Sequence, residues 1–266
     1  MDVRELVAKV GRLMDQRRFG EAEAVCREVL ANGDAPDGAR ILVLEPLVRI
    51  LRQDGRLAEA EGACREEVAL LEKMFGKGHA HVAPALHNLS LLLGMLGRHE
   101  EAIPVSDEEL AIVTASQPAE STAIADALVA LAEHHYELSR FEVAELLVQR
   151  ALDLYEKADG RQSLGVSTCL NNLGRIYENM GDNEMGVKFL RESAQIRQDL
   201  LGVHPDTAFS LLNYGTGLAA LGRFGEAAEA LARCQAIYRE LGMEESPHAK
   251  ACAENLGLCG RAQARA

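Results

Sequence analysis

The sequence lacks the features that mark membrane, secreted and nucleic-acid-binding proteins. No apolar run approaches the roughly 20 residues needed to span a bilayer. The opening MDVRELVAKVGRLMDQRRF mixes charged and apolar side chains where a signal peptide would have an uninterrupted apolar core. The net charge is -13 and no local basic patch offsets it, so the surface repels nucleic acid and anionic membranes. We therefore expect a cytoplasmic protein that binds neither nucleic acid nor membranes.

Sequence signatures of catalysis and of metal binding are missing as well. The chain has no Gly-rich phosphate loop, no GxSxG and no HExxH. His79 and His81 are two residues apart, but no Cys, His or acidic residue completes a metal site at a recognisable spacing. The sequence therefore predicts a protein that is not an enzyme and that has no cofactor and no bound metal.

Cysteine is present without any CxxC pair. The six cysteines are Cys26, Cys64, Cys169, Cys234, Cys252 and Cys259. An even number can indicate disulfides, but all six lie within helical patterns in a chain with no sign of secretion. We expect free thiols that act as small apolar core residues. The rest of the composition, 48% hydrophobic and 26% charged with only 7 Pro, is typical of a folded protein of 266 residues.

The strongest signal in the chain is an internal repeat of 42 residues. One motif occurs as GRLAEA at Gly55, GRHEEA at Gly97, SRFEVA at Ser139, GDNEMG at Gly181 and GRFGEA at Gly222, at intervals of 42, 42, 42 and 41 residues. A second motif has the same period, with asparagines at positions 88, 172, 213 and 255. Self-similarity at a fixed period indicates an architecture in which each repeat is one supersecondary unit.

Each repeat has the pattern of two helices. In residues 164–180, Leu170, Leu173 and Tyr177 share one helical face. Gly181 follows, and glycine can adopt the left-handed conformation that ends a helix. The stretch FEVAELLVQRALDLYEK, residues 141–157, has the same periodicity and forms the second helix of its repeat. The sequence therefore predicts an all-α protein.

These motifs resemble the tetratricopeptide repeat (TPR) family. The spacing Leu170-x2-Leu173-Gly174-x2-Tyr177 matches the family pattern W-x2-L-G-x2-Y, with Leu in place of Trp. The 42-residue period resembles the long-repeat subtype of kinesin light chains, as do the segments LLGVHPDTAFSLLNYG and FGKGHAHVAPALHNLS. The resemblance implies an α-solenoid, a right-handed superhelix of antiparallel helix pairs, over nearly the whole chain.

The resemblance also implies a single array over residues 1–266. Its repeats are about 1–37, 38–77, 78–119, 120–161, 162–202 and 203–244. Residues 245–266 align with a first helix that has no second helix after it. We expect this last helix to cover the apolar face of the preceding pair, as terminal capping elements do.

In this family the first helices line the concave face of the superhelix, and that face is where the resemblance places a ligand. Asn88, Asn172, Asn213 and Asn255 map to one position on it. An asparagine amide both donates and accepts hydrogen bonds, so a ladder of amides can bind the main chain of an extended peptide. In the alternative interpretation, each asparagine bonds a neighbouring helix end or an inter-repeat loop.

The same register adds residues that do not recur. They are His87, Asn171, Arg175, Arg49 and Arg52. The three arginines are the evident partners for an anionic group, and Asn171 with Arg175 is where the groove could be selective. We therefore predict a protein-interaction scaffold that binds a protein or peptide. Two alternatives stay open: a structural module that self-associates into homo-oligomers, and a regulatory sensor subunit of a bacterial-type signalling assembly.

Two acidic residues occupy unexpected positions. Glu67 and Glu109 lie in the second-helix register that holds Ala151 in another repeat, where helices are expected to pack. Each could pair with an arginine across the joint between repeats, or mark a looser joint. The sequence does not decide between these interpretations.

Overall fold

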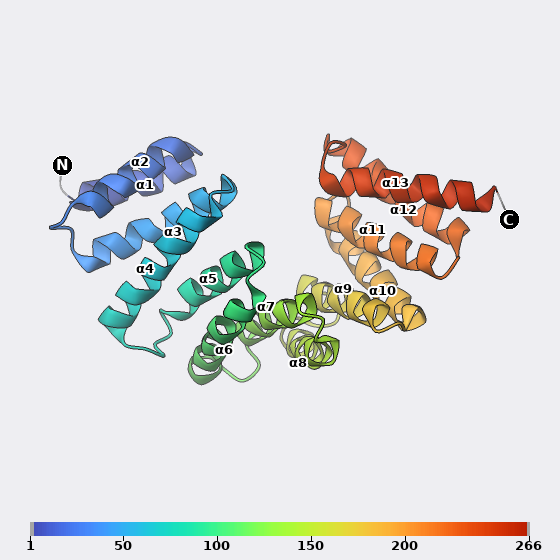
Figure 1. Ribbon diagram of the computed structural model, residues 1–266, viewed down its shortest axis with the longest axis horizontal. Coiled ribbons are helices and arrows are strands. Elements are labelled where there is room, and N and C mark those ends of the chain that lie inside the picture. The colour runs from blue at the N-terminus through green and yellow to red at the C-terminus, as the bar shows by residue number, and fades with distance from the viewer. Residues whose placement is uncertain (1–2, 265–266) are drawn as a thin grey trace. The chain divides into compact units, whose positions relative to one another are not determined.

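The computed structural model describes residues 3–264 and is built from helices joined by short loops (Figure 1). Its helices are α1 (Val3–Asp15), α2 (Phe19–Ala31), α3 (Asp37–Gln53), α4 (Leu57–Phe75), α5 (Ala83–Met95), α6 (His99–Ser116), α7 (Thr122–Glu137), α8 (Phe141–Asp159), α9 (Leu164–Asn179), α10 (Asn183–Leu201), α11 (Pro205–Ala220), α12 (Phe224–Glu240) and α13 (Pro247–Gln263). No strand occurs within the described range. The prediction of an all-α solenoid is confirmed.

Each 42-residue period corresponds to one pair of helices. The helices α9 and α10, for example, fall within residues 162–202 and pack against each other. Gly181 ends the first helix of this pair with a φ of +89°, as the sequence predicted. The backbone N–H of Asp182 then donates to the carbonyl oxygen of Tyr177 at 2.9 Å, which satisfies a carbonyl group at the end of the helix. The glycine that starts the repeat motif therefore fixes the turn between the two helices.

The helices pack into two compact units. The first contains the chain up to Ala119 together with Glu133–Leu138, and the second contains Glu120–Ala132 together with the chain from Ser139 onward. In the first unit, α1 to α6 contribute to a continuous buried apolar core. In the second unit, α10 to α13 form another, and α13 contacts both α11 and α12.

All six cysteines are buried free thiols, as predicted. The Sγ atom of Cys64 donates to the carbonyl oxygen of Ala85 at 3.3 Å, and Cys252 makes the same type of bond to Leu231 at 3.1 Å. Burial raises the pKa of the Cys64 thiol to about 12, so the thiol stays protonated at neutral pH. These cysteines contribute to helix packing.

Candidate functional site

Each unit contains first helices of neighbouring repeats that contact one another directly. In the first unit α1 contacts α3, and in the second unit α11 contacts both α9 and α13. The predicted binding residues lie on α3, α5, α9, α11 and α13, which are all first helices. The structure thus places every predicted site residue on the helix type that the sequence assigned to it.

The predicted asparagine ladder separates into two kinds of residue. Asn213 donates from Nδ2 to Oδ1 of Asn171 at 2.8 Å, and Asn255 donates from Nδ2 to Oγ1 of Thr216 at 3.1 Å. Both bonds join first helices of adjacent repeats. Asn213 and Asn255 thus form internal hydrogen bonds, as the alternative interpretation predicted. Their partners, however, are side chains of the adjacent first helix, and not a helix end or a loop.

Asn171 is not exposed to a ligand, contrary to the expectation that it makes the groove selective. Its side chain is only 4% exposed, because it lies between α9 and α11 and accepts the hydrogen bond from Asn213. A buried amide must be hydrogen-bonded, which explains why an asparagine is tolerated there. Asn171 therefore belongs to the packing of the second unit.

Asn88 and Asn172 differ from the other three asparagines of the predicted site in having no internal hydrogen bond to a described residue. Both are partly exposed, and neither side chain has a hydrogen-bond partner among residues 3–264. Their amides can therefore bond to a ligand without breaking an internal bond.

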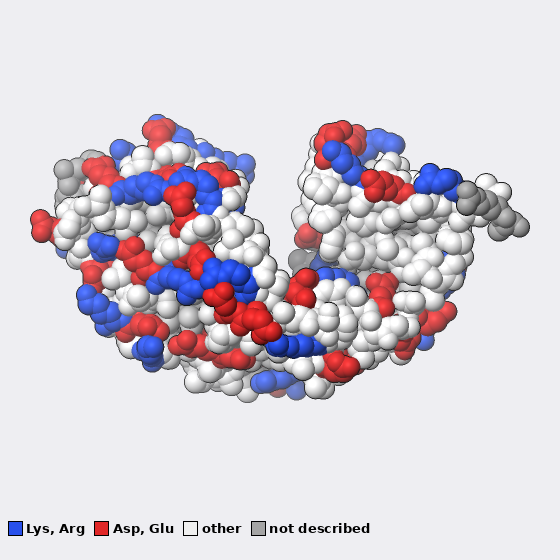
Figure 2. Space-filling model, viewed as in Figure 1, with Lys and Arg blue, Asp and Glu red and all other residues white. Residues whose placement is uncertain are grey.

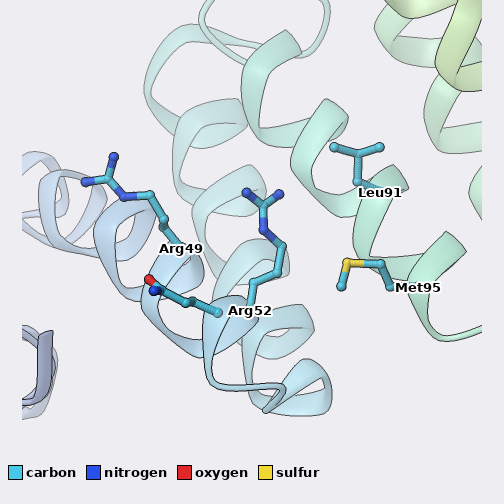
Figure 3. Close-up of a pocket in the computed structure, with 5 residues that line it drawn as sticks. Arg49, Arg52, Leu91 and Met95 are labelled. Atoms are coloured by element: carbon cyan, nitrogen blue, oxygen red, sulfur yellow. The ribbon is translucent and has the colours of Figure 1, made fainter. Parts of the chain in front are cut away.

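Arg49 and Arg52 of α3 line an open hollow of about 510 Å³ (Figure 3). Gln53 of the same helix also contributes, and Leu91 and Met95 of α5 form the opposite side. Figure 3 shows the Arg52 side chain directed toward the space beside Leu91, whereas Arg49 projects away from α5. Met95 is 55% exposed. Guanidinium groups and an apolar surface therefore lie side by side on two adjacent first helices.

These two arginines have no ion pair or hydrogen bond to another described residue. Nearby arginines of the first unit differ: the Arg56 guanidinium lies 2.8 Å from Glu23, and that of Arg98 lies 2.6 Å from Glu61. Figure 2 shows positive and negative side chains interleaved over the visible face, as such pairing requires. Arg49 and Arg52 are thus uncompensated positive charges on a chain of net charge -13.

His87 and Arg175 lie in more crowded surroundings. Nδ1 of His87 is 2.9 Å from Oε1 of Glu109, a carboxylate on α6 that is 4% exposed. The partner of Glu109 is therefore a histidine of its own repeat, and not an arginine across a joint as one interpretation suggested. Arg175 is partly buried on α9, where its charge favours the ionised form of Glu178.

Sequence reasoning missed Leu91, Met95 and Gln53. Leu91 lies six residues before the helix-ending Gly97, and the residues at the same position in other repeats are Arg49, Glu133, Arg175 and Thr216. The position thus holds a different chemical type in nearly every repeat. That variability was the available signal, because a position that packs the solenoid together repeats its residue type.

His79 and His81 lie in the loop between α4 and α5. The ring of His79 stacks on Phe75 with centroids 5.1 Å apart, and its Nδ1 accepts the backbone N–H of His81 at 3.2 Å. No group of three or more His, Cys, Asp or Glu residues that could hold a metal ion occurs between residues 3 and 264. Over the same range, none of the helices is both long and apolar enough to cross a bilayer.

Stacked helix pairs of fixed period, with first helices in mutual contact, define a helical repeat protein of the α-solenoid class. The family model described as tetratricopeptide repeat matches residues 39–115, 123–185 and 176–240. These matches cover more than half of the chain, and the chain belongs to the tetratricopeptide repeat family. No curated protein matches the sequence.

Solved structures share the fold at low sequence identity. BtubC (BKLC) from P. vanneervenii is 22% identical over 91% of this chain and 93% of its own, with a TM-score of 0.68. Kinesin light chain TPR-like repeats from Podosopora anserina are 21% identical over 76% and 96% of the two chains, with a TM-score of 0.63. The quorum sensor NprR from B. thuringiensis is 13% identical over 97% and 68%, with a TM-score of 0.74.

Proposed function

We propose that the protein is a non-enzymatic scaffold that binds a peptide or partner segment on the inner first-helix face. The observation that carries this proposal is the hollow where the unpaired guanidinium groups of Arg49 and Arg52 lie beside Leu91 and Met95. A guanidinium group presents donors that match a carboxylate. The neighbouring apolar side chains provide contact area that loses water on binding.

The amide of Asn88 adds a second kind of contact. Asn88 is one turn before Leu91 on α5 and has no partner of its own among the described residues. An amide of this kind bonds peptide main chain whatever the peptide sequence. The ligand is therefore held by its main chain at Asn88 and selected by its side chains at the hollow.

A similar fold solved in a complex supports the proposal. A Rap protein, solved in complex with Competence and Sporulation Factor, is 13% identical over 97% of this chain and 85% of its own, with a TM-score of 0.64. A shared fold does not transfer a ligand, since functions on one fold differ with the site. The complex supports only a binding role for a protein of this fold.

Reversing the charge of both arginines should weaken peptide binding at least tenfold. A hydrogen bond to a charged group contributes about 1.5–3 kcal/mol, and Arg49→Glu with Arg52→Glu replaces two attractions with two repulsions. The tightest binder from an immobilised peptide library would be labelled and its affinity for both proteins measured by fluorescence anisotropy. Arg150→Glu with Arg191→Glu is the matched control, because these arginines are exposed on the second helices α8 and α10. An equal loss in both double variants, or no loss in the first, would overturn the proposal.

Removing the unpartnered amide beside the hollow should weaken binding without changing its sequence preference. We expect Asn88→Ala to reduce affinity roughly three- to tenfold for every library peptide that binds, because the variant loses a hydrogen bond of about 1 kcal/mol. Asn213→Ala is the control. It should lower the free energy of unfolding, since the buried amide oxygen of Asn171 loses its donor, and should leave affinity nearly unchanged. Weaker binding in Asn213→Ala alone would contradict this division of roles.

A further inference from the structure

The repeats provide an internal comparison of one helix–helix contact. In the third repeat, His87 and Glu109 lie ten residues before and twelve residues after Gly97, and their side chains meet at 2.9 Å. The corresponding pairs in the other repeats are Glu45 with Glu67, Val129 with Ala151, Asn171 with Ser193, and Leu212 with Cys234. By register, each pair consists of one residue on the first helix and one on the second helix of the same repeat.

Four of these five pairs are chemically matched. Two combine apolar or weakly polar side chains. One places a histidine against Oε1 of a carboxylate, Glu109, whose buried Oε2 has no hydrogen-bond partner among the described residues. In another, Ser193 donates to the carbonyl oxygen of Ser167 at 2.7 Å, while Asn171 accepts from Asn213. The remaining pair, Glu45 with Glu67, places two acidic side chains at the same contact. Only this repeat lacks a donor or an apolar partner at that position.

Glu67 has a buried carboxyl group without a hydrogen-bond donor in the described part of the chain. The residue is 6% exposed, and its Oε2 atom is buried with no hydrogen-bond partner among residues 3–264. Burial raises the pKa of its carboxyl to about 7, and the nearby Glu45 adds to the effect. Three cations on α3 and α4 are bound elsewhere: Arg65 lies 2.9 Å from Glu61, Arg40 pairs with Glu66, and Lys73 lies 2.7 Å from Asp37. A buried carboxyl group without a donor destabilises a fold, so its presence calls for a partner from outside.

We infer that Glu45 and Glu67 form a receptor for a cationic side chain, a lysine ammonium or an arginine guanidinium, of the bound peptide. The inference rests on the proposed function. Glu45 is exposed on α3, and its charge contributes to the raised pKa of Glu67, so the two carboxyl groups lie near each other. The ligand cation supplies the donor that His87 supplies to Glu109 in the next repeat.

The position of this receptor constrains the ligand further. Arg49 and Arg52 lie four and seven residues after Glu45 on α3, which places the three side chains along one helical face. At 1.5 Å per residue, Glu45 and Arg52 are about 10 Å apart along the helix axis. An extended peptide covers that distance in about three residues. The ligand class is therefore a peptide with a basic residue about three residues from a carboxylate.

Ligand binding at this receptor should release a proton. A cation beside Glu67 favours the ionised carboxylate and lowers its pKa, so the complex holds fewer protons than the free protein. Affinity should consequently rise between pH 6 and pH 8. The charged group that acts on Glu67 from α3 is Glu45. Arg49, one turn further along α3, forms no ion pair with either acid.

A library of eight-residue peptides tests the inference. Each peptide carries Glu at one position and either Lys or norleucine three residues away, so that the two sets share aliphatic length and differ in charge. We expect the wild-type protein to prefer the Lys set at least tenfold. Glu67→Gln should reduce the preference to about twofold or less. Glu45→His, which recreates the His87–Glu109 pair, should remove the preference and also raise the midpoint of urea unfolding. Glu109→Gln, the counterpart of Glu67→Gln in the next repeat, should retain the preference for the Lys set.

The outcomes separate this inference from the proposed function. If peptides bind and depend on Arg49 and Arg52 but show no Lys preference, the receptor is wrong and the scaffold function stands. If no peptide of either set binds, both are wrong. Circular dichroism of each variant checks that it is folded. If Glu45→His does not fold, Glu67→Gln, which keeps the size of the side chain, still measures the loss of the Lys preference.

Discussion

Gly174→Ala is expected to lower the free energy of unfolding by about 1 kcal/mol, the balance of an overpacking cost and a gain in helix preference. A Cβ atom at this position would lie 2.5 Å from Cγ of Leu190 and 3.1 Å from the backbone oxygen of Gly186. The backbone oxygen cannot yield unless α10 moves away from α9. Overpacking of this kind costs about 1–3 kcal/mol, which exceeds the gain of roughly 1 kcal/mol that alanine brings to a helix interior. Urea unfolding followed by circular dichroism measures the difference.

The matched control is Gly257→Ala. Gly257 occupies the same repeat position on α13, but the only atom near its added Cβ is the end of the Arg261 side chain, at 3.6 Å. With no clash, the helix preference for alanine should dominate and raise the free energy of unfolding by up to about 1 kcal/mol. If both substitutions changed the free energy of unfolding in the same direction, the close approach of α9 and α10 would not be the reason for a glycine at position 174.

The protein is also expected to lose about 3 kcal/mol of stability through His134 as the pH falls from 6.5 to 4. His134 is 3% exposed on α7. Its Nε2 atom is 2.7 Å from Oγ of Ser90, and its Nδ1 atom is 3.3 Å from Nδ1 of His99. Gly94 leaves room for the ring, because a Cβ there would lie 2.9 Å from its Cε1 atom. Burial, with smaller contributions from the charges of His99 and His135, lowers the pKa of His134 to about 4.

The sign follows from proton binding in the two states. The unfolded histidine takes up a proton near pH 6.5, whereas the folded one does so near pH 4. Between these values the unfolded state binds more protons, so acidification favours unfolding. The difference between the two pKa values corresponds to about 3 kcal/mol. Burial raises the pKa values of Glu67 and Glu178 to about 7, which makes their contributions opposite in sign.

The measurement therefore compares wild type with His134→Gln by urea unfolding at pH 7.5, 5.5 and 4.5. The variant keeps both glutamates, so the difference between the two curves isolates the histidine. We expect His134→Gln to be less stable than wild type at pH 7.5 and to lose much less stability on acidification. Parallel pH curves for the two proteins would contradict the assignment.

The repeat pattern predicted the helix pairs because their determinants are local. A glycine such as Gly181 ends the first helix, and residues such as Leu170 and Leu173 give it an apolar face, whatever lies next to it. The same register placed the predicted binding residues on first helices. The helix pairs and the helix type of each site residue could be predicted from the sequence because the same motif recurs in each repeat.

Pairing across repeats could not be predicted in the same way. Asn213 bonds Asn171 and not Asn172, its counterpart in the repeat. The repeat interval here is 41 residues, whereas the bonded residues are 42 apart, so the contact is shifted by one residue. The hollow joins Arg52 of one repeat to Met95 of the next, and no motif links those positions. The sequence indicated that Glu67 and Glu109 were unusual, but only the packing of α5 on α6 revealed His87 as the partner of Glu109.

The binding proposal is tested most directly by NMR of the protein labelled at its methionine methyl groups, with and without the tightest library peptide. Met95 lines the hollow, whereas Met180 and Met243 are exposed in the second unit and report non-specific contact. We expect a saturating peptide to shift the Met95 signal and to leave those of Met180 and Met243 in place. Arg49→Glu with Arg52→Glu should abolish the shift. A peptide that binds tightly while the Met95 signal stays unchanged would contradict the proposal.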